Sequence, residues 1–573
     1  MMTLYGIGGI PGCARGTAVI KPARTITVVR RSTEDPEAEC ARLSRAREAA
    51  VAHAEACYES ALAEIGEDSA KIFRAYREIL SDDAFFSVVE ERVRAEGVCI
   101  DSVLEEEKQN IAAVFAQQDD PYLRERGTDI ENVCNELLAA LYGGEEPFTL
   151  PEGDSLVVFA DDLTPTDTLK LDKARLAGFV TERGGATSHT AILAKTLGIP
   201  AILGLEGVLG QVSGGETALL YGEEGRLILS PDGEALAQFR ADRERHARRG
   251  ARLAVAALAP ALAPDGRTVH ICSNLGEADS AQAFDGAICD GVGLLRTEFL
   301  YMRCEHYPTE EEQFSFYRDM ALATGEKALI IRTLDIGGDK QAPYMDLPCE
   351  DNPFLGCRAI RLCLERRDVF QTQLRAILRA TPFGNVKIMF PMIVTLEELL
   401  EAKAVLAQAM DELEAEGTPF RREVEVGIMV ETPAAAVLSD VLARHADFFS
   451  IGANDLIQYT TATDRMNQRL QYLYTSSNLS VLRLIRVVCK NAHAAGIPVG
   501  ICGEAACEIP LLPLWLAFGV DELSMAPSQI GLVKHHIAAL SGEDLRRAAE
   551  ALDGAGVIAD LRAVLAPLSE KGL

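Results

Sequence analysis

The sequence predicts a multidomain α/β protein: a C-terminal (β/α)8 TIM barrel, and an N-terminal α/β domain with an inserted all-α helical bundle. Three observations lead to this fold class. Eight apolar, strand-like runs alternate with helical patterns after residue 262, as in a (β/α)8 barrel. A second set of strand-like runs is interrupted by long amphipathic helical patterns. At 573 residues the chain is also too long for one hydrophobic core.

The N-terminal α/β domain is expected to comprise residues 1–20 and 145–229. Its opening is rich in glycine and strand-forming residues and carries no charge before Arg15. Strand-like runs return after residue 144 and alternate with short helical patterns; they cover Ser155–Ala160, Ala177–Val180, Ala201–Leu203, Ala218–Tyr221 and Arg226–Leu229. The simplest interpretation is one domain whose chain is interrupted between its two parts.

Residues 21–144 are expected to form the inserted helical bundle. Alanine, glutamate and arginine dominate, which are strong helix formers, and apolar residues recur three and four positions apart. The segment has 15 Lys and Arg against 26 Asp and Glu, a net charge of −11. Two interpretations of this acidity stay open: a solvated surface, or a docking face for a basic protein.

Residues 230–261 are expected to form a charged helical linker, and residues 262–573 the barrel. Such barrels place their chemistry at the C-terminal ends of the strands, so the residues that end each run are the first candidates for a site. The eight strand-like runs are Thr268–Asn274, Gly291–Phe299, Ala328–Asp335, Val386–Met392, Glu425–Glu431, Phe448–Asp455, Pro498–Glu504 and Glu522–Met525.

The composition excludes several classes of function. A net charge of −30 argues against nucleic acid and anionic membranes and favours basic partners. No apolar run reaches the roughly 18–20 residues that span a bilayer, and the N-terminus lacks a signal pattern. We therefore expect a cytoplasmic protein without membrane insertion. The 14 cysteines include no Cys-x-x-Cys pair, so a zinc site is not expected and the thiols should stay reduced.

The stretch Gly184–Ala194, GGATSHTAILA, is the first candidate site. Two glycines permit a tight turn, and the Thr and Ser residues around His189 are natural helix-capping types. This pattern predicts that His189 lies at a helix N-terminus, where free N–H groups and the helix dipole favour an anion. An imidazole there could accept a phosphoryl group; the alternative is a structural histidine at a cap.

The ends of the predicted barrel strands carry a second candidate site. They present Asn274, Arg296, Arg332, Glu431, Asn454, Asp455 and Cys502, and nearby loops add Arg358 and Arg465. Arginine forks match phosphate and carboxylate oxygens, so the four arginines predict an anion clamp. The two carboxylates suit Mg²⁺, which binds one or two carboxylates together with substrate phosphate oxygens. A small phosphorylated carboxylate is therefore expected, with Cys502 as either a proton carrier or a structural thiol.

These motifs resemble the phosphoenolpyruvate-utilising enzymes, and most closely the enzyme I group of the bacterial sugar phosphotransferase system, over essentially the whole chain. The motifs are GGATSHTAILA, GVGLLRTEFL, RTLDIGGDK, DNPFLGCRAIR, GIMVETP, SIGANDLIQY and GICGE.

The resemblance implies a phosphoenolpyruvate–protein phosphotransferase. Phosphoenolpyruvate and Mg²⁺, with Mn²⁺ as an alternative, would bind the barrel, and His189 would be phosphorylated on Nε2. The group would pass to a histidine of the small carrier HPr, the first step of sugar uptake. Thr168 would hold the other nitrogen of the His189 ring and so fix its tautomer. The family also dimerises through its barrels, so a homodimer is expected.

Three departures from the family pattern stand out. The family often has Arg at the position of Ala186 and His at that of Tyr76, and Tyr474–Ser480 lacks the usual prolines. The first and last leave the core chemistry intact. Tyr76 bears on carrier recognition, because the family's HPr-docking face lies on that helix.

The sequence disfavours three rival functions. A pyruvate phosphate dikinase or phosphoenolpyruvate synthase needs a nucleotide-binding domain, for which residues 21–144 are too short and too helical. A nitrogen-regulatory paralogue needs a further sensory domain, which we do not expect before Leu4. A regulatory relay that binds without transferring is disfavoured, because the sequence keeps His189, Glu431, Asp455 and Cys502.

Overall fold

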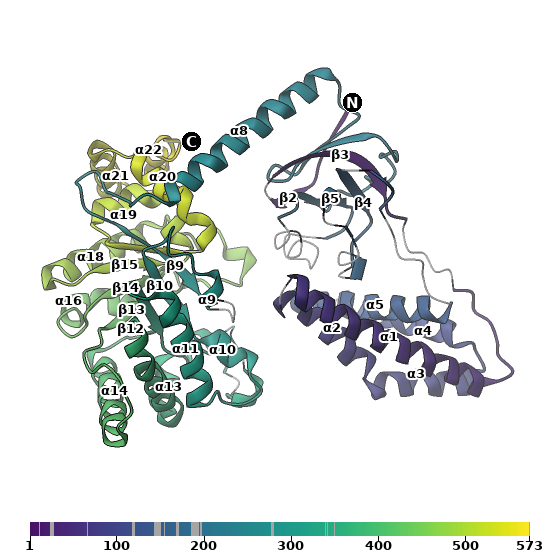
Figure 1. The fold of residues 1–573 in the computed structure, drawn as a ribbon, viewed down its shortest axis with the longest axis horizontal. Helices are drawn as coiled ribbons and strands as arrows, with labels where there is room; N and C mark the ends of the chain where they lie inside the picture. Colours follow the sequence, from purple (N-terminus) through teal and green to yellow (C-terminus); the bar gives the residue numbers. More distant parts are fainter. Residues whose placement is uncertain are drawn as a thin grey trace. The chain divides into compact units, whose positions relative to one another are not determined.

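The computed structural model describes residues 1–10, 12–22, 28–65, 67–116, 121–142, 150–153, 155–164, 166–167, 171–172, 174–184, 194, 198–276, 280–338, 340, 342–348 and 350–571. These residues form two compact units, Met1–Ala247 and Arg248–Leu573 (Figure 1). Each unit has its own hydrophobic cores, as expected for a chain of this length.

The first unit contains an eight-stranded sheet built from both ends of its sequence. The strand order is β1-β8-β7-β3-β4-β5-β6-β2. Pairs β3–β4, β4–β5 and β5–β6 are parallel, whereas β1–β8, β7–β8, β3–β7 and β2–β6 are antiparallel. The strands are β1 (Met2–Tyr5), β2 (Ile7–Ile10), β3 (Cys13–Ile20), β4 (Leu156–Ala160), β5 (Leu176–Thr181), β6 (Ala201–Leu203), β7 (Thr217–Tyr221) and β8 (Arg226–Leu229).

A helical bundle lies between β3 and β4 in the sequence. Its apolar positions recur at helical spacing and form one buried core that includes Leu43, Tyr76, Val89, Leu104 and Leu137. The helices are α1 (Pro36–Ile65), α2 (Glu67–Leu80), α3 (Asp83–Glu96), α4 (Ile100–Ala116) and α5 (Pro121–Leu141). An all-α insertion within a mixed sheet agrees with the predicted fold class.

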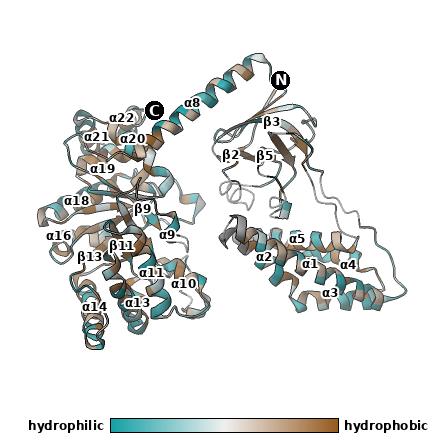
Figure 2. Cartoon of the chain, in the orientation of Figure 1, coloured by the Kyte–Doolittle hydropathy of each residue, from teal (hydrophilic) through white to brown (hydrophobic). Residues whose placement is uncertain are grey.

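Helix α8 (Gly233–Ala257) follows the sheet and runs into the second unit. Near its start Phe239 is buried and packs edge-on against Tyr221 of β7. At its end Lys534 Nζ donates a hydrogen bond to Ala257 O over 2.9 Å. Residues 243–250 are exposed, and Figure 2 shows hydrophilic colour along this part of the helix. The charges of α8 therefore lie on a solvated face.

The second unit is a closed barrel of eight parallel strands, in the order β10-β11-β12-β13-β14-β15-β16-β9. The predicted (β/α)8 barrel is confirmed, and with it the fold class. The strands are β9 (His270–Leu275), β10 (Gly291–Arg296), β11 (Ala328–Arg332), β12 (Asn385–Phe390), β13 (Val426–Val430), β14 (Phe449–Gly452), β15 (Val499–Cys502) and β16 (Glu522–Met525).

Helices lie between the strands and around the barrel. They are α9 (Ser280–Ala283), α10 (Glu298–Arg303), α11 (Glu310–Thr324), α12 (Ile360–Glu365), α13 (Arg367–Ala380), α14 (Leu396–Glu416), α15 (Pro433–Val437), α16 (Ser439–Leu442), α17 (Ala453–Thr461), α18 (Leu479–Ala495), α19 (Leu512–Phe518), α20 (Ile530–Ala539), α21 (Gly542–Gly554) and α22 (Ile558–Ser569). Short 3-10 turns cover Pro343–Met345, Pro353–Leu355, Thr381–Phe383, Gln468–Leu470, Glu504–Cys507, Ile509–Leu511 and Pro527–Gln529.

Most barrel strands end earlier than the sequence predicted. The hydrophobic pattern predicts one strand over Phe448–Asp455, but β14 ends at Gly452 and α17 begins at Ala453. Apolar residues continue from the strand into the first turn of this buried helix, so hydrophobicity alone does not mark the boundary. The polar residues of the candidate site thus lie at or just beyond the strand ends.

Candidate active site at the barrel mouth

The C-terminal ends of the barrel strands, here called the barrel mouth, gather most of the predicted site residues. Arg296, Arg332 and Cys502 are the last residues of β10, β11 and β15. Glu431 follows β13 directly. Since parallel strands in register end on the same side, these side chains converge: Arg296 pairs with Arg332, and Gly452 with Cys502.

Arg332 lies in a buried network of charges. Its Nη2 is 2.5 Å from Glu298 Oε1 and 3.0 Å from Asp335 Oδ2. Nη1 has only the Met429 sulfur at 3.6 Å, a weak acceptor, and Nε is buried without a hydrogen-bond partner among the described residues. A guanidinium held at one nitrogen, with its other donors unfulfilled, is suited to bind an anion.

Asp335 connects Arg332 to two further cations. Its Oδ2 accepts a hydrogen bond from Lys340 Nζ over 2.7 Å, and its Oδ1 accepts one from Arg358 Nη2 over 2.8 Å. Lys340 also donates to Glu298 Oε1 over 2.8 Å. Burial by itself raises the pKa of the Asp335 carboxyl, but the three cations hold that pKa well below its usual range. Asp335 is therefore a charged hub.

Sequence reasoning missed Glu298, Asp335 and Lys340. A signal was present, because these residues lie inside GVGLLRTEFL and RTLDIGGDK, the motifs that supplied Arg296 and Arg332. Acidic residues beside an anion-binding arginine are expected when that arginine is buried, since a buried charge needs a partner.

Arg358 differs from the other predicted anion ligands. Its side chain is 0% exposed. Besides the bond to Asp335, Nη1 donates to Asp455 Oδ1 over 3.2 Å and to the Tyr459 hydroxyl over 3.3 Å. The side chain, which comes from the loop between β11 and α12, therefore bridges the carboxylates of Asp335 and Asp455.

The two predicted metal ligands form a repulsive pair of carboxylates. Glu431 is buried, and its Oε1 accepts a hydrogen bond from the Met392 backbone N–H over 2.6 Å. Burial, with the nearby charges of Asp455 and Asp335, raises the pKa of Glu431 to about 8. A cation between these carboxylates would relieve both effects, so the residues fit a hard divalent metal.

The rest of such a metal shell would come from outside the protein. Within the part of the chain that the structure describes, no three His, Cys, Asp or Glu residues are grouped as a ready-made site. Mg²⁺ commonly retains waters and substrate phosphate oxygens around one or two carboxylates, so two protein ligands suffice.

Cys502 lies beside Arg332 and Glu431. Its thiol is buried and donates to Ile451 O over 3.4 Å. Burial raises the pKa of Cys502 to about 11, although the nearby arginines oppose the rise. The thiol thus carries its proton at neutral pH, as a proton donor must.

The remaining predicted residues occupy the loops of the mouth. The side chain of Arg465 is 17% exposed, and its Nη1 is 3.8 Å from Asp455 Oδ2. Asn454 is the second residue of α17, and its carbonyl accepts a hydrogen bond from the Tyr474 hydroxyl over 3.2 Å. Asn274 bonds through both ends of its amide to Ser524, over 3.1 and 2.5 Å. Asn274 is therefore tied to the neighbouring strand.

His189, Thr168 and Ala186 lie outside the described residues. Two neighbours of Thr168 are described. Asp167 accepts from Lys21 Nζ over 2.7 Å in a buried pair, and Thr166 Oγ1 donates to Glu136 Oε1 of α5 over 3.0 Å. The segment before Thr168 is thus bonded to the residue that follows β3 and to helix α5 of the bundle.

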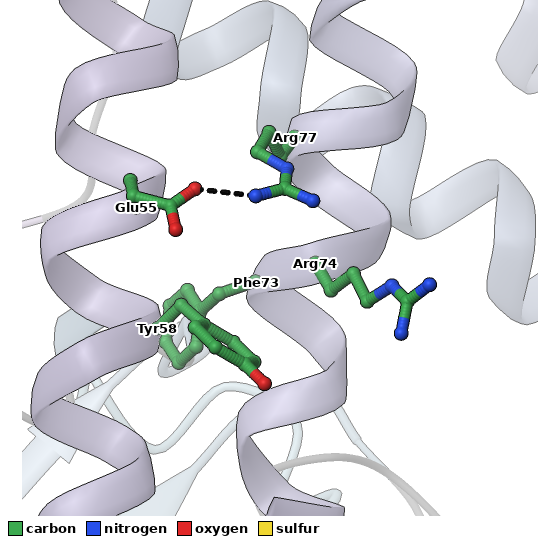
Figure 3. Close-up of a pocket in the computed structure, with 5 residues that line it drawn as sticks. All are labelled: Glu55, Tyr58, Phe73, Arg74 and Arg77. Atoms are coloured by element: carbon green, nitrogen blue, oxygen red, sulfur yellow. Dashed lines mark hydrogen bonds and ion pairs between the residues drawn. The ribbon is translucent and has the colours of Figure 1, made fainter. Parts of the chain in front are cut away.

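The bundle presents a small pocket between α1 and α2. Figure 3 shows the rings of Tyr58 and Phe73 between the two helices, the Glu55–Arg77 ion pair above them, and Arg74 pointing away. These residues line a cavity of about 250 Å³. Tyr76, which the sequence linked to carrier recognition, is instead 1% exposed and accepts a hydrogen bond from Asn132 over 3.1 Å. A buried side chain of this kind supports the bundle core and presents nothing to a partner.

Among the described residues, none of the helices combines the length and apolar character needed to cross a membrane.

Three family models match the chain, in the order expected from the motifs. Residues 5–126 match the PEP-utilising enzyme N-terminal model, residues 151–225 the mobile-domain model and residues 251–541 the PEP-binding-domain model. The matches cover β2, β3 and most of the bundle, then strands β4 to β7, and then all eight barrel strands.

Curated relatives extend over nearly the whole chain. A phosphoenolpyruvate-protein phosphotransferase of Geobacillus stearothermophilus is 42% identical, with 96% of this chain and 95% of the relative aligned. One of Bacillus subtilis (strain 168) is 40% identical over 95% of each chain. A solved structure of an Enzyme I protein, nEIt, covers 42% of this chain and 99% of its own, with 34% identity and a TM-score of 0.37.

Proposed function

Because the chain belongs to the PEP-utilising enzyme family and is a phosphotransferase, we propose that it transfers the phosphoryl group of phosphoenolpyruvate to His189 and then to HPr. Pyruvate is released in the first step, and the second step begins sugar uptake. The observation that carries the proposal is the convergence at the barrel mouth of Arg332, with unfulfilled donors, the Glu431–Asp455 pair and the protonated thiol of Cys502.

In the proposed reaction, each of these residues has one role: substrate binding, acceptance of the phosphoryl group or proton delivery. Arg296, Arg332, Arg465 and Asn454 bind and orient the phosphate and carboxylate of phosphoenolpyruvate. The bond between the enol oxygen and phosphorus breaks as a bond forms to Nε2 of His189. The electron pair left on the enol oxygen becomes the enolate of pyruvate, and Cys502 delivers its proton to C3.

Glu431 and Asp455 would hold the metal, Mg²⁺ or Mn²⁺. When bound there, the ion neutralises charge on the phosphate oxygens. Glu431→Gln and Asp455→Asn should each raise the Mg²⁺ concentration needed for half-maximal pyruvate release. Direct Mn²⁺ binding in the absence of substrate should weaken in parallel. An unchanged metal titration in both variants would refute the ligand assignment.

His189 is the proposed phosphoryl acceptor, with Thr168 bonded to its other ring nitrogen. Incubation with labelled phosphoenolpyruvate and Mg²⁺ should label His189 alone. The label should be lost in acid and kept in base, as for a phosphohistidine. A stoichiometric acid-labile label on the His189→Ala variant would show that another residue accepts the group.

The helical bundle is the proposed docking region for HPr. The acidity of residues 21–144 would favour a basic face on the carrier. The α1–α2 surface adds the partly exposed charges of Glu55, Arg74 and Arg77 and the ring of Tyr58 at the cavity of Figure 3. Release of pyruvate that depends on both phosphoenolpyruvate and HPr would separate this function from a dikinase, a synthase or a relay that binds without transfer.

The remaining assignments complete the proposal. Residues 1–20 with 145–229 form the phosphohistidine domain, residues 21–144 bind HPr, residues 230–261 link the two halves, and residues 262–573 bind phosphoenolpyruvate and form a homodimer. The enzyme would act in the cytoplasm. Sedimentation at several concentrations, with and without phosphoenolpyruvate, tests the dimer.

A further inference from the structure

The side chain of Arg465 extends to the barrel mouth, and hydrogen bonds fix the backbone of this residue. Its N–H donates to Gln458 Oε1 over 3.0 Å, and its carbonyl accepts from Gln471 Nε2 over 2.6 Å. The guanidinium interacts with the Tyr474 hydroxyl, and it is 3.8 Å from Asp455 Oδ2, too far for a strong hydrogen bond to that carboxylate. The direction of the guanidinium must therefore be set by other contacts as well.

The ring of Phe354 supplies such a contact. The guanidinium carbon of Arg465 is 5.0 Å from the ring centroid, within the range of cation–π attraction. Phe354 belongs to a short 3-10 turn, Pro353–Leu355, in the loop that also carries Arg358. This contact joins the loop after β11 to the loop after α17.

The position of Phe354 is fixed from two sides. The Tyr459 hydroxyl donates to the Phe354 carbonyl over 2.5 Å and accepts from Arg358 Nη1 over 3.3 Å. On the other side, Gly338 lies so close that a Cβ there would be 2.9 Å from the ring. Gly338 has φ +70°, a conformation that glycine adopts without strain.

A cavity of about 380 Å³ lies beside the ring, lined by residues 351–355 and by the end of α17 with the turn after it. Because this space is open, a smaller or untethered side chain at position 354 could move away from Arg465. The hydroxyl tether and the close approach of Gly338 oppose that movement.

We propose that Phe354 is a positioning residue for phosphoenolpyruvate binding: its ring holds the Arg465 guanidinium in place, and the Arg358–Tyr459 hydrogen bonds hold the ring. This role rests on the proposed function of Arg465. It also gives buried Arg358 a task other than direct contact with phosphate, because both of its terminal nitrogens are already bonded within the protein.

The test is direct binding of phosphoenolpyruvate to the full-length chain. The His189→Ala background prevents turnover, and calorimetry in saturating Mg²⁺ gives the dissociation constant. Phe354→Leu should weaken binding by about three- to thirtyfold, the range of a cation–π contact. Tyr459→Phe, which keeps the ring and removes the tether, should weaken it by less.

A double-mutant cycle separates positioning from packing. In an Arg465→Met background, Phe354→Leu should change the dissociation constant by less than about twofold, because its effect passes through Arg465. A matched control is Phe314→Leu, which removes a ring 4.1 Å from the Arg379 guanidinium on the outer helices α11 and α13. That control should leave phosphoenolpyruvate binding unchanged.

The outcomes are distinct. Equal weakening by Phe354→Leu in both backgrounds, or none in either, would overturn the positioning role. If Arg465→Met alone leaves binding unchanged, both Arg465 as a ligand and Phe354 as its support are refuted, while the phosphotransfer to His189 stands or falls by the labelling experiment. Thermal unfolding of each variant confirms that the barrel is intact, and Tyr459→Phe provides the test if Phe354→Leu fails to fold.

Discussion

The ion pairs of the barrel mouth are buried, whereas those of the helical bundle are partly exposed to solvent. At the mouth, Asp335 is buried and shared among Arg332, Lys340 and Arg358. In the bundle, Arg92 likewise contacts three carboxylates, Glu96, Glu106 and Glu107, but on a partly exposed surface. The two networks have similar connectivity and different surroundings.

Burial decides what each network can do. A buried ion pair is hardly screened by salt, and removing one partner leaves an uncompensated charge. An exposed pair contributes little to stability and weakens as salt is added. The mouth is therefore suited to hold reacting groups in fixed places, and the bundle to attract a partner from solution.

The largest expected effect concerns the reacting groups themselves. Cys502→Ala should lower turnover by about 10²–10⁴-fold, the contribution of a well-placed proton donor. Because no charged group is lost, phosphoenolpyruvate binding should persist. Steady-state pyruvate release and calorimetric binding measure the two quantities. Near-normal turnover would make the thiol a packing residue.

The second effect compares the networks directly. Asp335→Asn keeps the size of the side chain but leaves three cations without their shared charge, so the barrel should lose about 3–5 kcal/mol of stability. The matched bundle variant is Glu106→Gln, since Glu106 contacts both Arg30 and Arg92. Its cost should stay below about 1 kcal/mol.

Urea unfolding can follow the two regions separately. Trp515 is the only tryptophan of the chain and is buried in the barrel helix α19, so its fluorescence reports the barrel. Helical circular dichroism adds the bundle. Comparable losses for Asp335→Asn and Glu106→Gln would contradict the distinction between buried and exposed networks.

The same contrast explains what the sequence could predict. Alternation of strand-like runs and helical patterns identified the barrel, and the polar residues that end the runs identified Arg296, Arg332, Glu431 and Cys502 as neighbours at one face. These conclusions need only the period of hydrophobicity and the fact that parallel strands end together.

The hydrophobic pattern could not predict which individual side chains are buried or which charged side chains form ion pairs. The sequence does not distinguish Arg358 from Arg465, because both are arginines in predicted loops. In the structure Arg358 is fully buried between two carboxylates, whereas Arg465 is partly exposed beside an aromatic ring. Tyr76 was assigned to a docking helix, but a helical position does not say which face points inward until neighbouring helices are packed.

A third effect tests the bundle as the docking region. Transfer from phosphorylated enzyme to HPr should slow by about tenfold between low and high salt, because screening removes opposite-charge steering. Phosphorylation of His189 by phosphoenolpyruvate should change much less, because Arg332 and the proposed metal ligands Glu431 and Asp455 are buried at the barrel mouth. Rapid-quench measurement of each half-reaction gives both rates, and equal salt sensitivity would argue against docking on the acidic bundle.

The smallest expected effect concerns an ion pair in which one side chain is buried and the other is partly exposed. Ser541 is the N-cap of α21, and Asp544 completes its capping box. The Asp544 side chain is 2% exposed and contacts Lys571, whose side chain is 41% exposed. Burial alone raises the pKa of Asp544, but the bonds from Lys571 and Ser541 lower it to about 2. The folded pKa lies below the unfolded value near 3.9, so the pair stabilises the fold above about pH 4. That stabilisation is lost as the pH falls towards about 2.

Because Lys571 is partly solvated, the contribution should be only about 1 kcal/mol. Stability measured from Trp515 fluorescence at pH 7 should therefore fall by about that amount in Lys571→Met, and the difference from the unaltered chain should shrink as the pH drops below about 4. A difference that stays constant down to pH 2.5 would show that Lys571 acts through packing of its aliphatic stem and not through the charge of Asp544.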